Sequence, residues 1–312
     1  MLTHVKPPVF WALGGIIGIL LLASVVTVLL KRLHPETHYL ELHQRIRSWW
    51  IMVGIFAGAI LLSRTASIVF FAFISFLALK EYVSLIPTRR ADRRVLFWAY
   101  AAIPIQYLWV HWEWYGMFII FIPVYLFLLL PMRMVLIGET KEFLRAAGTL
   151  HWGLMMMVFS VSHAAFFLVL AEDKNPIAGG AGLVLYLVFL TQFNDVAQYV
   201  WGKMTGHHKI IPKVSPNKTW EGFLGGLATT IGLAALLAPQ FTPLTLHESL
   251  LAGLLIGCGG FIGDVTISAL KRDIGVKDSG TLLPGHGGIL DRIDSLTYTA
   301  PILFHFIYYL HY

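Results

Sequence analysis

The chain is short of charge and almost without cysteine. Of its 312 residues only 13% are charged, whereas soluble domains carry about 25%, so an ordinary soluble fold is excluded. The single cysteine, Cys258, cannot form an internal disulfide bond, and nothing in the sequence points to an oxidising compartment. We find no phosphate-binding P-loop, no Gly-x-Ser-x-Gly nucleophile elbow, no low-complexity tract and no internal repeat.

Hydrophobic residues, by contrast, make up 57% of the chain and form ten apolar runs from end to end. Several runs reach the ~20 residues that a helix needs to cross the hydrocarbon core of a bilayer. Because lipid offers the backbone no hydrogen bonds, each run is expected to be helical. We therefore predict an all-α, polytopic membrane bundle of about ten transmembrane helices, although fusion of the short second, third and fourth runs stays open. The runs are residues 9–30, 49–63, 65–79, 95–110, 115–132, 150–171, 177–201, 221–238, 248–270 and 296–311.

The basic residues gather in alternate loops. Of the 23 lysines and arginines, only Lys6, Arg64 and Lys174 lie outside five loops, which cover residues 31–48, 80–94, 133–149, 202–220 and 271–295. Basic loops mark the cytoplasmic side, so we expect a multi-pass protein of the inner (cell) membrane with these loops in the cytoplasm and both termini outside. The net charge of +6 then faces anionic headgroups and cytosolic anions, and no nucleic-acid partner is needed to explain it.

The two longest polar loops of the C-terminal half, 202–220 and 271–295, are rich in reactive side chains. We therefore divide the chain into N-terminal transmembrane helices, residues 1–175 with about six spans, and a C-terminal catalytic part, residues 176–312.

Asp264 is the most informative residue, because it lies inside the apolar run 248–270. A carboxylate in that position is costly unless it is paired or bound to a metal, and it marks a functional site by default. Asp264, Ser268 and Lys271 follow helical spacing and so lie on one face. The alternative is that Asp264 only forms a salt bridge with a neighbouring helix.

A second acidic group stands at the start of the last run. Asp291 and Asp294 are spaced to lie on one face of a helix. Carboxylates from two helices that face one pocket suit a hard cation such as Mg²⁺, shared with substrate phosphates. We therefore expect Asp264, Asp291 and Asp294 to be metal ligands. The alternative is a solvated first turn whose acids complement the helix dipole.

A glycine-rich turn precedes this acidic group. In Pro284–Gly288, Gly287 and Gly288 allow backbone N–H groups to approach an anion just ahead of a helix N-terminus. Most glycine-rich segments are only turns, but cations flank this one, and together they predict a phosphate cradle. The cations are Lys271, Arg272, Lys277 and Arg292.

The other polar loop contains a comparable segment, Ser215–Gly222. Asn217 or Thr219 can cap the next helix, and Lys218 is placed to meet a phosphate, although an ordinary basic turn is the alternative. Asp195 stands near the end of the preceding run. It orients a nucleotide, completes a metal shell or only bonds to its neighbours.

At these loops the sequence resembles the phosphatidate cytidylyltransferase (CDP-diacylglycerol synthase) family. The stretch from Ser268 to Asp294 matches the family's signature at every defining position, and the Ser-Pro-x-Lys-Thr-x-Glu-Gly element at Ser215–Gly222 matches as well. The resemblance covers roughly residues 190–296, while residues 1–175 resemble the family only as hydrophobic spans. One departure is Gln198, where many members have a small residue.

The resemblance implies that the phosphate of phosphatidate attacks the α-phosphorus of CTP, which releases pyrophosphate and forms CDP-diacylglycerol for phospholipid biosynthesis. Because the attacking phosphate is already an anion, the step needs charge neutralisation and alignment rather than a strong base. The predicted catalytic residues are Asp264, Asp291 and Lys271. The predicted substrate-binding residues are Ser215, Lys218, Ser268, Arg272, Lys277, Asp278, His286, Gly287, Gly288, Arg292 and Asp195.

The predicted cofactor is Mg²⁺, and a second, monovalent cation is left open, as is a homodimer. The predicted partners are CTP, phosphatidate and membrane lipid. Three other functions stay open at this point: cytidylyl or phosphoryl transfer to an isoprenoid phosphate or alcohol, ion-coupled transport, and a non-catalytic lipid-binding scaffold. A transporter would place its functional carboxylates near the midplane, reachable from both sides.

Overall fold

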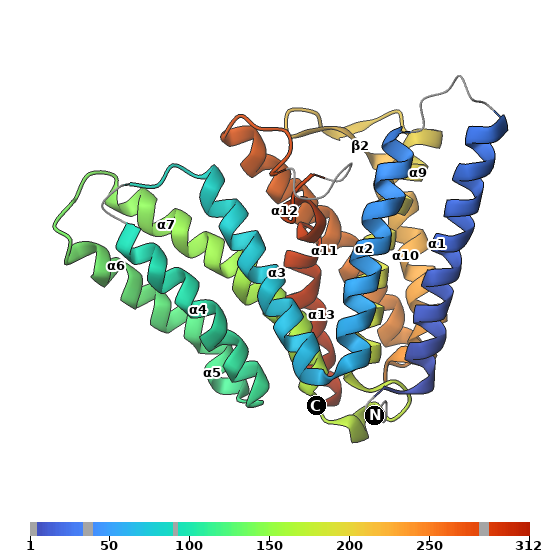
Figure 1. The fold of residues 1–312 in the computed structure, drawn as a ribbon, viewed down its shortest axis with the longest axis horizontal. Helices are drawn as coiled ribbons and strands as arrows, with labels where there is room; N and C mark the ends of the chain where they lie inside the picture. Colours follow the sequence, from blue (N-terminus) through green and yellow to red (C-terminus); the bar gives the residue numbers. More distant parts are fainter. Residues whose placement is uncertain (1–4, 34–39, 90–92, 281–286) are drawn as a thin grey trace.

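The computed structural model describes residues 5–33, 40–89, 93–280 and 287–312, and it is an almost entirely helical bundle (Figure 1). A short antiparallel hairpin interrupts the helices, and the sequence did not predict it. The elements are α1 (Pro7–Leu33), α2 (Leu40–Leu62), α3 (Arg64–Leu85), α4 (Arg93–His111), α5 (Tyr115–Ile120), η2 (Phe121–Leu126), α6 (Phe127–Val135), α7 (Phe143–Leu154), η3 (Met155–Ser160), α8 (Val161–Phe166), η4 (Phe167–Val169), η5 (Glu172–Lys174), α9 (Gly179–Thr205), β1 (Lys209–Ile211), β2 (Ser215–Thr219), α10 (Trp220–Phe241), α11 (Leu246–Asp273), α12 (Leu290–Ile293) and α13 (Leu296–His311).

The predicted fold class is confirmed. Each apolar run lies, apart from a few end residues, in one helix or in one continuous series such as α5–η2–α6. Within the described residues, eight helical segments are long and apolar enough to cross a membrane. The short second, third and fourth runs are not fused, because they form three separate helices, α2, α3 and α4. The chain is therefore a polytopic integral membrane protein.

Side-chain caps set the start of several helices. The Ser63 hydroxyl accepts from the N–H of Ala66 at the start of α3. Of the two residues proposed to cap α10, Thr219 is the cap, and it accepts from the N–H of Gly222. Thr245 and Glu248 form a reciprocal capping box at the start of α11. These caps fix where the polar connections meet the helices.

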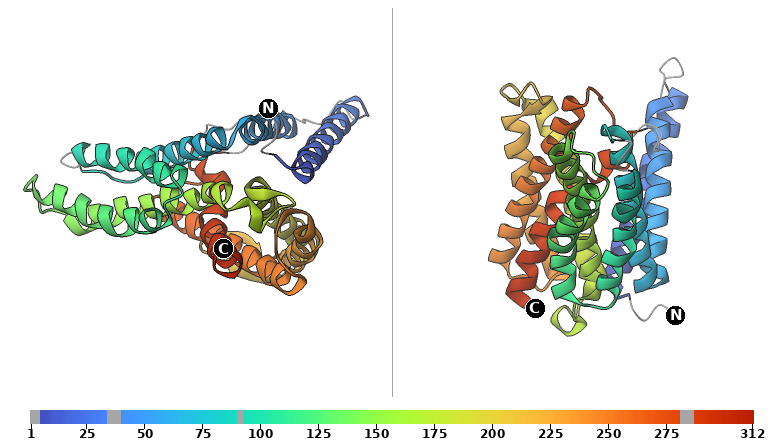
Figure 2. Two further views of the ribbon diagram at one scale, coloured as in Figure 1. Left: turned by 90° about the horizontal axis from the view of Figure 1, so that it is seen from below. Right: turned by 90° about the vertical axis from the view of Figure 1, so that its left-hand side faces the viewer.

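The helices form two groups. Helices α4–α7 project to one side, away from α9, α10 and α11, and α1 lies at the opposite edge of the bundle (Figures 1 and 2). A dense aromatic core, in which Phe118, Phe166 and Phe304 contact one another, joins α5 and α8 to α13. Of the eight candidate spans, α1 is the least buried: only 17% of the residues in its most apolar stretch are buried in the bundle.

Both termini lie at one end of the bundle, and the hairpin and α12 lie at the other (Figure 1). The loops in which sequence analysis gathered the reactive residues therefore share one face of the protein, as alternating spans require. That this face is the cytoplasmic one stays a prediction from the distribution of lysine and arginine.

One glycine allows the C-terminal helices to meet closely. A Cβ atom at Gly263 of α11 would overlap the carbonyl oxygen of Asp294 and the Cα of Ser295. Without a side chain at this position, α11 packs directly against the junction of α12 and α13. This contact brings Asp264, the next residue, beside the acidic group that follows the glycine turn.

Candidate active site

Two adjoining pockets open where α9 and α11 meet the hairpin and α12. The first, which we call the acidic pocket, has a volume of about 280 Å³. It brings together five aspartates that sequence analysis selected, one from α9, one from α11 and three from the segment that follows α11. Its lining is Trp49, Gln192, Asp195, Val196, Asp264, Lys271, Asp278, Asp291, Arg292 and Asp294.

The second, the hairpin pocket, has a volume of about 530 Å³. It shares Asp195 and Asp264 with the acidic pocket, so these two carboxylates stand on the wall between them. Lysines and aromatic rings distinguish its lining, which is Asp195, Gln198, Tyr199, Gly202, Lys203, Lys209, Ser215, Asn217, Lys218, Thr219, Gly222, Phe223 and Asp264.

Lys218 connects the hairpin to the shared wall. Its Nζ lies 2.6 Å from Oδ2 of Asp264 and donates to Oε1 of Gln198 at 3.2 Å. Burial would lower the pKa of this ammonium group, but the carboxylates of Asp264 and Asp195 outweigh burial and raise it. Lys218 is therefore a permanent cation at the point where the two pockets meet.

A second group of contacts holds Asp195 and Asp294 at the same point. The Ser295 hydroxyl donates to Oδ1 of Asp195 at 3.0 Å, and the Ser295 N–H donates to Oδ1 of Asp294 at 2.8 Å. Burial, reinforced by the charges of Asp264 and Asp195, raises the pKa of Asp294 well above its usual range. The carboxylates of Asp195, Asp264 and Asp294 thus crowd together at this point.

Asp291 has a different environment. Its Oδ1 accepts from Lys271 Nζ at 2.6 Å, and its Oδ2 accepts from the Ser279 N–H and hydroxyl and from the Gly288 N–H, at 2.9–3.1 Å. Burial would raise the pKa of Asp291, but the hydrogen bonds from Lys271, Ser279 and Gly288 hold it below its usual range. Asp291 therefore binds the turn to α11.

Glu81, on α3 in the N-terminal part, completes the turn. Its carboxylate accepts from the N–H of Ile289 at 2.9 Å and of Leu290 at 3.1 Å, and so caps α12. A Cβ at Gly288 would overlap this carboxylate, which explains why glycine stands there. Sequence analysis missed Glu81 because it is placed at the end of an apolar run, where a charged residue looks like an ordinary interfacial one.

Three backbone N–H groups at the end of the glycine turn already have side-chain acceptors. Gly287 has the positive φ of 77° that favours glycine, and the N–H groups of Gly288, Ile289 and Leu290 donate to Asp291 and Glu81. These three groups position Asp291 and the start of α12, and a phosphate cradle at the rest of the turn stays a prediction. His286, predicted to bind substrate, lies outside the described residues.

The other predicted residues divide between the pockets and their surroundings. Ser268 donates to Oδ1 of Asp264 at 3.3 Å, which confirms that these two residues share a face of α11. Arg272 donates through Nε to the carbonyl oxygen of Val214 at 3.3 Å and links α11 to the hairpin. Ser215 lines the hairpin pocket and Asp278 the acidic pocket, whereas Lys277 contributes to neither lining.

Two polar groups in the pockets lack partners. Among the described residues, the buried Nε of Arg292 and the buried Nε2 of Gln198 have no hydrogen-bond partner. Arg292 lines the acidic pocket and Gln198 the hairpin pocket. Since buried polar groups are normally hydrogen-bonded, each pocket has one lining residue with an unsatisfied donor.

Comparison with known proteins gives the family. The sequence model of the Cytidylyltransferase family matches residues 43–310. The chain belongs to this family. It is therefore a nucleotidyltransferase of the membrane, and the ion-coupled transporter considered above is set aside. The geometry agrees with this outcome, because the site residues gather at the hairpin end of the bundle.

Individual relatives agree with the family. The chain is 48% identical over 298 residues to the uncharacterized protein YnbB of Escherichia coli (strain K12), covering 96% of this chain and 98% of the relative. It is 31% identical over 255 residues to a phosphatidate cytidylyltransferase of Staphylococcus haemolyticus, covering 81% and 94%. A Staphylococcus aureus phosphatidate cytidylyltransferase is 43% identical over 126 residues, covering 40% and 48%. The cytidylyltransferase likeness thus extends well into residues 1–175.

We predict that the cytidylyltransferase depends on Glu81 for the position of the turn. In Glu81→Ala two backbone N–H groups lose a charged acceptor, and hydrogen bonds to charged groups contribute about 1.5–3 kcal/mol each. We expect a lower melting temperature and about tenfold lower kcat, measured by thermal unfolding in detergent and by CTP turnover. Glu81→Gln, which keeps one acceptor oxygen, should lie between. Lys80→Ala is the control, and wild-type behaviour of Glu81→Ala would remove this role.

Proposed function

We propose that this cytidylyltransferase transfers the cytidylyl group of CTP to the phosphate of phosphatidate. The observation that carries the proposal is the pair of polar pockets divided by Asp195 and Asp264 at one end of an apolar bundle. The hairpin pocket is rich in lysine, and the acidic pocket adjoins apolar surface. The names of the staphylococcal relatives support the same lipid substrate.

We assign CTP to the hairpin pocket. Lys203, Lys209 and Lys218 supply cations for a triphosphate there, and Tyr199 and Phe223 supply aromatic faces for the base. Gln198 also lines this pocket; its Oε1 accepts from Lys218, and its Nε2 has no partner. Gln198 departs from the residue common in the family, so its amide is a feature of this branch.

We assign the lipid phosphate to the acidic pocket. Arg292 and Lys271 line this pocket, and Lys271 is held there by Asp291. A guanidinium group suits a phosphate because it donates in a fixed, planar geometry. Both phosphates then approach the shared wall of Asp195 and Asp264 from opposite sides.

The carboxylates at this wall suit Mg²⁺. Among the described residues no three acidic, histidine or cysteine side chains form a complete metal site by themselves, but Mg²⁺ commonly uses one or two carboxylates together with waters and substrate phosphates. Asp195 and Asp264, the two carboxylates that the pockets share, are the residues that would hold it together with substrate phosphates, whereas Asp291 is committed to Lys271, Ser279 and Gly288. The bound ion would neutralise phosphate charge.

The residues present account for the rest of the step. An oxygen of the lipid phosphate attacks the α-phosphorus of CTP, the bond from that phosphorus to the β-phosphate bridge breaks, and pyrophosphate leaves. No proton must be removed from the attacking oxygen, so no general base is required. Lys218 lies at the wall between the two pockets, where the cytidylyl group is transferred. Its ammonium group can leave the Asp264 carboxylate and bind the phosphates of CTP.

The test is transfer of radiolabel from [α-³²P]CTP into lipid by purified protein. We expect labelled product with phosphatidate and Mg²⁺, loss of product with EDTA, and recovery when Mg²⁺ is restored. Parallel reactions with an isoprenyl phosphate and the same labelled CTP, and with an isoprenyl alcohol and CTP labelled at the γ-phosphate, separate the alternative lipid acceptors. Labelling of an isoprenyl acceptor in place of phosphatidate would overturn the lipid assignment, and turnover that persists in EDTA would overturn the metal assignment.

A further inference from the structure

Three groups hold the ammonium group of Lys218. Its Nζ lies 2.6 Å from Oδ2 of Asp264, donates to Oε1 of Gln198 at 3.2 Å and lies 5.7 Å from the centre of the Phe261 ring. A carboxylate, an amide oxygen and the face of an aromatic ring each attract a cation. Because only 18% of the Lys218 side chain is exposed, this ammonium group has a fixed position and lacks the freedom of a surface lysine.

Gln198 reaches Lys218 because α10 leaves room for it. Gln198 is buried, and a Cβ atom at Gly226 of α10 would overlap its Cγ. Glycine at this position therefore makes space between α9 and α10 for a long side chain. The amide oxygen of that side chain accepts from Lys218, so the packing of the two helices helps to determine where the ammonium group lies.

The carboxylates at the wall between the pockets already have donors. Lys218 binds Oδ2 of Asp264, and the Ser268 hydroxyl donates to Oδ1 at 3.3 Å. Lys218 also attracts Asp195, whose Oδ1 accepts from Ser295. The ammonium group thus gives these two carboxylates the positive charge that Mg²⁺ would give them. Because two cations beside one carboxylate repel each other, a divalent cation gains full access to Asp264 only when Lys218 leaves it.

We propose that Lys218 is a built-in counter-ion that keeps Mg²⁺ out of the site until CTP binds. This inference rests on the proposed function. A triphosphate in the hairpin pocket offers Lys218, which lines that pocket, a second set of anionic oxygens. When Lys218 moves to these phosphates, Asp264 is released for the ion that accompanies the nucleotide. At each stage the Asp264 carboxylate has a cation beside it, so no buried charge is left unpaired.

This exchange gives the site a fixed order of loading. Without CTP the carboxylates are paired with the protein's own cation, so Mg²⁺ binds weakly and phosphatidate meets no metal ion before the nucleotide is in place. The alternative is that the pair of Lys218 and Asp264 only fastens the hairpin to α11. In that case removal of Lys218 loosens the hairpin but creates no affinity for a metal ion.

The test is Mn²⁺ binding by the full chain in detergent, without turnover. Free Mn²⁺ is measured by electron paramagnetic resonance, with and without the CTP analogue that carries an uncleavable methylene group between its α- and β-phosphates. Mn²⁺ bound by the analogue alone is measured separately and subtracted. The variants are Lys218→Met, Gln198→Met and the matched control Lys209→Met, which removes a cation from the lining of the same pocket and leaves the pair with Asp264 intact.

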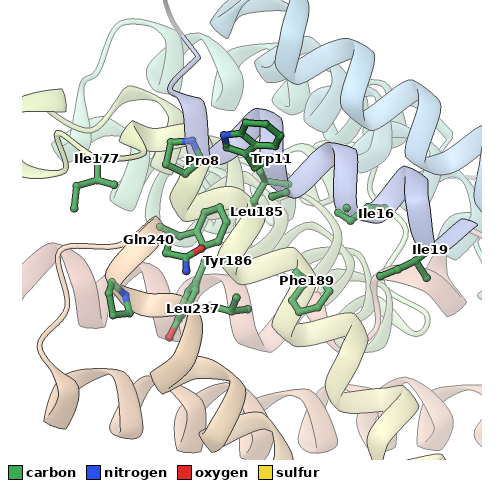
Figure 3. Close-up of a pocket in the computed structure, with 14 residues that line it drawn as sticks. Pro8, Trp11, Ile16, Ile19, Ile177, Leu185, Tyr186, Phe189, Leu237 and Gln240 are labelled. Carbon is green, nitrogen blue, oxygen red and sulfur yellow. The ribbon is translucent and has the colours of Figure 1, made fainter.

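The apolar cavity between α1, α9 and α10 does not compete for the probe. It has a volume of about 570 Å³ and is lined by side chains such as Trp11, Leu185 and Phe189 (Figure 3). Among the described residues, its lining includes no carboxylate, histidine or cysteine, and carboxylates are the side chains that suit Mn²⁺. Adding Asp264→Asn to Lys218→Met should abolish any gain in Mn²⁺ binding, which assigns that gain to the wall between the polar pockets.

We expect Lys218→Met to bind Mn²⁺ without nucleotide on the order of 10²-fold more tightly than wild type, since the ion no longer displaces a buried ion pair. Gln198→Met keeps the bulk of its side chain but loses the acceptor oxygen, and should lie between. Lys209→Met should resemble wild type. With the analogue, wild type should bind Mn²⁺ tightly. Equally weak binding by wild type and Lys218→Met would overturn the proposal, as would tight binding by wild type without nucleotide.

Thermal unfolding gives a second readout that also works on wild type alone. Because a ligand that binds only the folded state raises the melting temperature, Mn²⁺ should raise that of wild type only when the analogue is present. In Lys218→Met, Mn²⁺ alone should restore part of the lost stability. A rise in wild type with Mn²⁺ alone would contradict the role of Lys218 while leaving the proposed function intact. Absence of labelled lipid from CTP and phosphatidate with wild type would mean that the proposed function itself has failed.

Discussion

Replacement of Asp264 by Asn is expected to lower kcat by on the order of 10³-fold while the protein stays folded. Asn has the same shape, and its side-chain oxygen can still accept from Lys218, which lies 2.6 Å from the carboxylate. The substitution removes the negative charge on the wall between the pockets, where both phosphates and the proposed Mg²⁺ meet. The measurement is radiolabel transfer at saturating CTP, together with thermal unfolding in detergent.

Asp273→Asn is the matched control for this experiment. It makes the same chemical change at the exposed last residue of the same helix, α11, and should leave both rate and stability unchanged. Near-normal turnover of Asp264→Asn would remove Asp264 from the site. If the variant loses both its fold and its turnover, Asp264 is a structural partner of Lys218. That is the alternative given in the sequence analysis, in which Asp264 only forms a salt bridge.

Replacement of Lys218 by Met is expected to lower both stability and activity. Removing one member of a buried ion pair costs about 3–5 kcal/mol, and the lower end applies here because Lys218 and Asp264 keep 18% and 23% exposure. We expect a lower melting temperature and about 10²-fold slower turnover, since three carboxylates then crowd together without their nearest ammonium group.

The double variant Lys218→Met with Asp264→Asn separates the two effects. Because it leaves neither charge unpaired, it should recover most of the lost melting temperature and still be inactive. Lys213→Met, at an exposed position between the two strands, is the control and should behave as wild type. Recovery of activity in the double variant would mean that the pair serves only to hold the hairpin against α11.

Sequence analysis could select the candidate residues because most of them lie in two contiguous polar segments. Asp264 is conspicuous in an apolar run, and Ser268 and Lys271 follow it at helical spacings, while Asp291 and Asp294 share a helical spacing of their own after the glycine turn. What the spacing could not determine is which groups pair. Lys271 and Asp291 lie on different elements and neutralise each other, while Asp195, from a third element, approaches Asp294 through Ser295. Pairing between elements depends on packing rather than on local pattern.

The helices could be predicted from the sequence, whereas the hairpin could not. Ten apolar runs determined the helices because each span must satisfy its own backbone in lipid. The hairpin was missed because Lys209–Ile211 has only three residues and Ser215–Thr219 is almost entirely polar, so neither strand shows alternation.

Glu81 has a consequence for how the protein is made. It enters the membrane with α3, yet the backbone groups it caps, at residues 289 and 290, are separated from it by more than 200 positions. During synthesis this carboxylate must stay hydrated at the bilayer edge until nearly the whole polypeptide has left the ribosome. Transfer activity therefore reports on completed biogenesis, and chains arrested before their final two helices should be inert however many spans they have inserted.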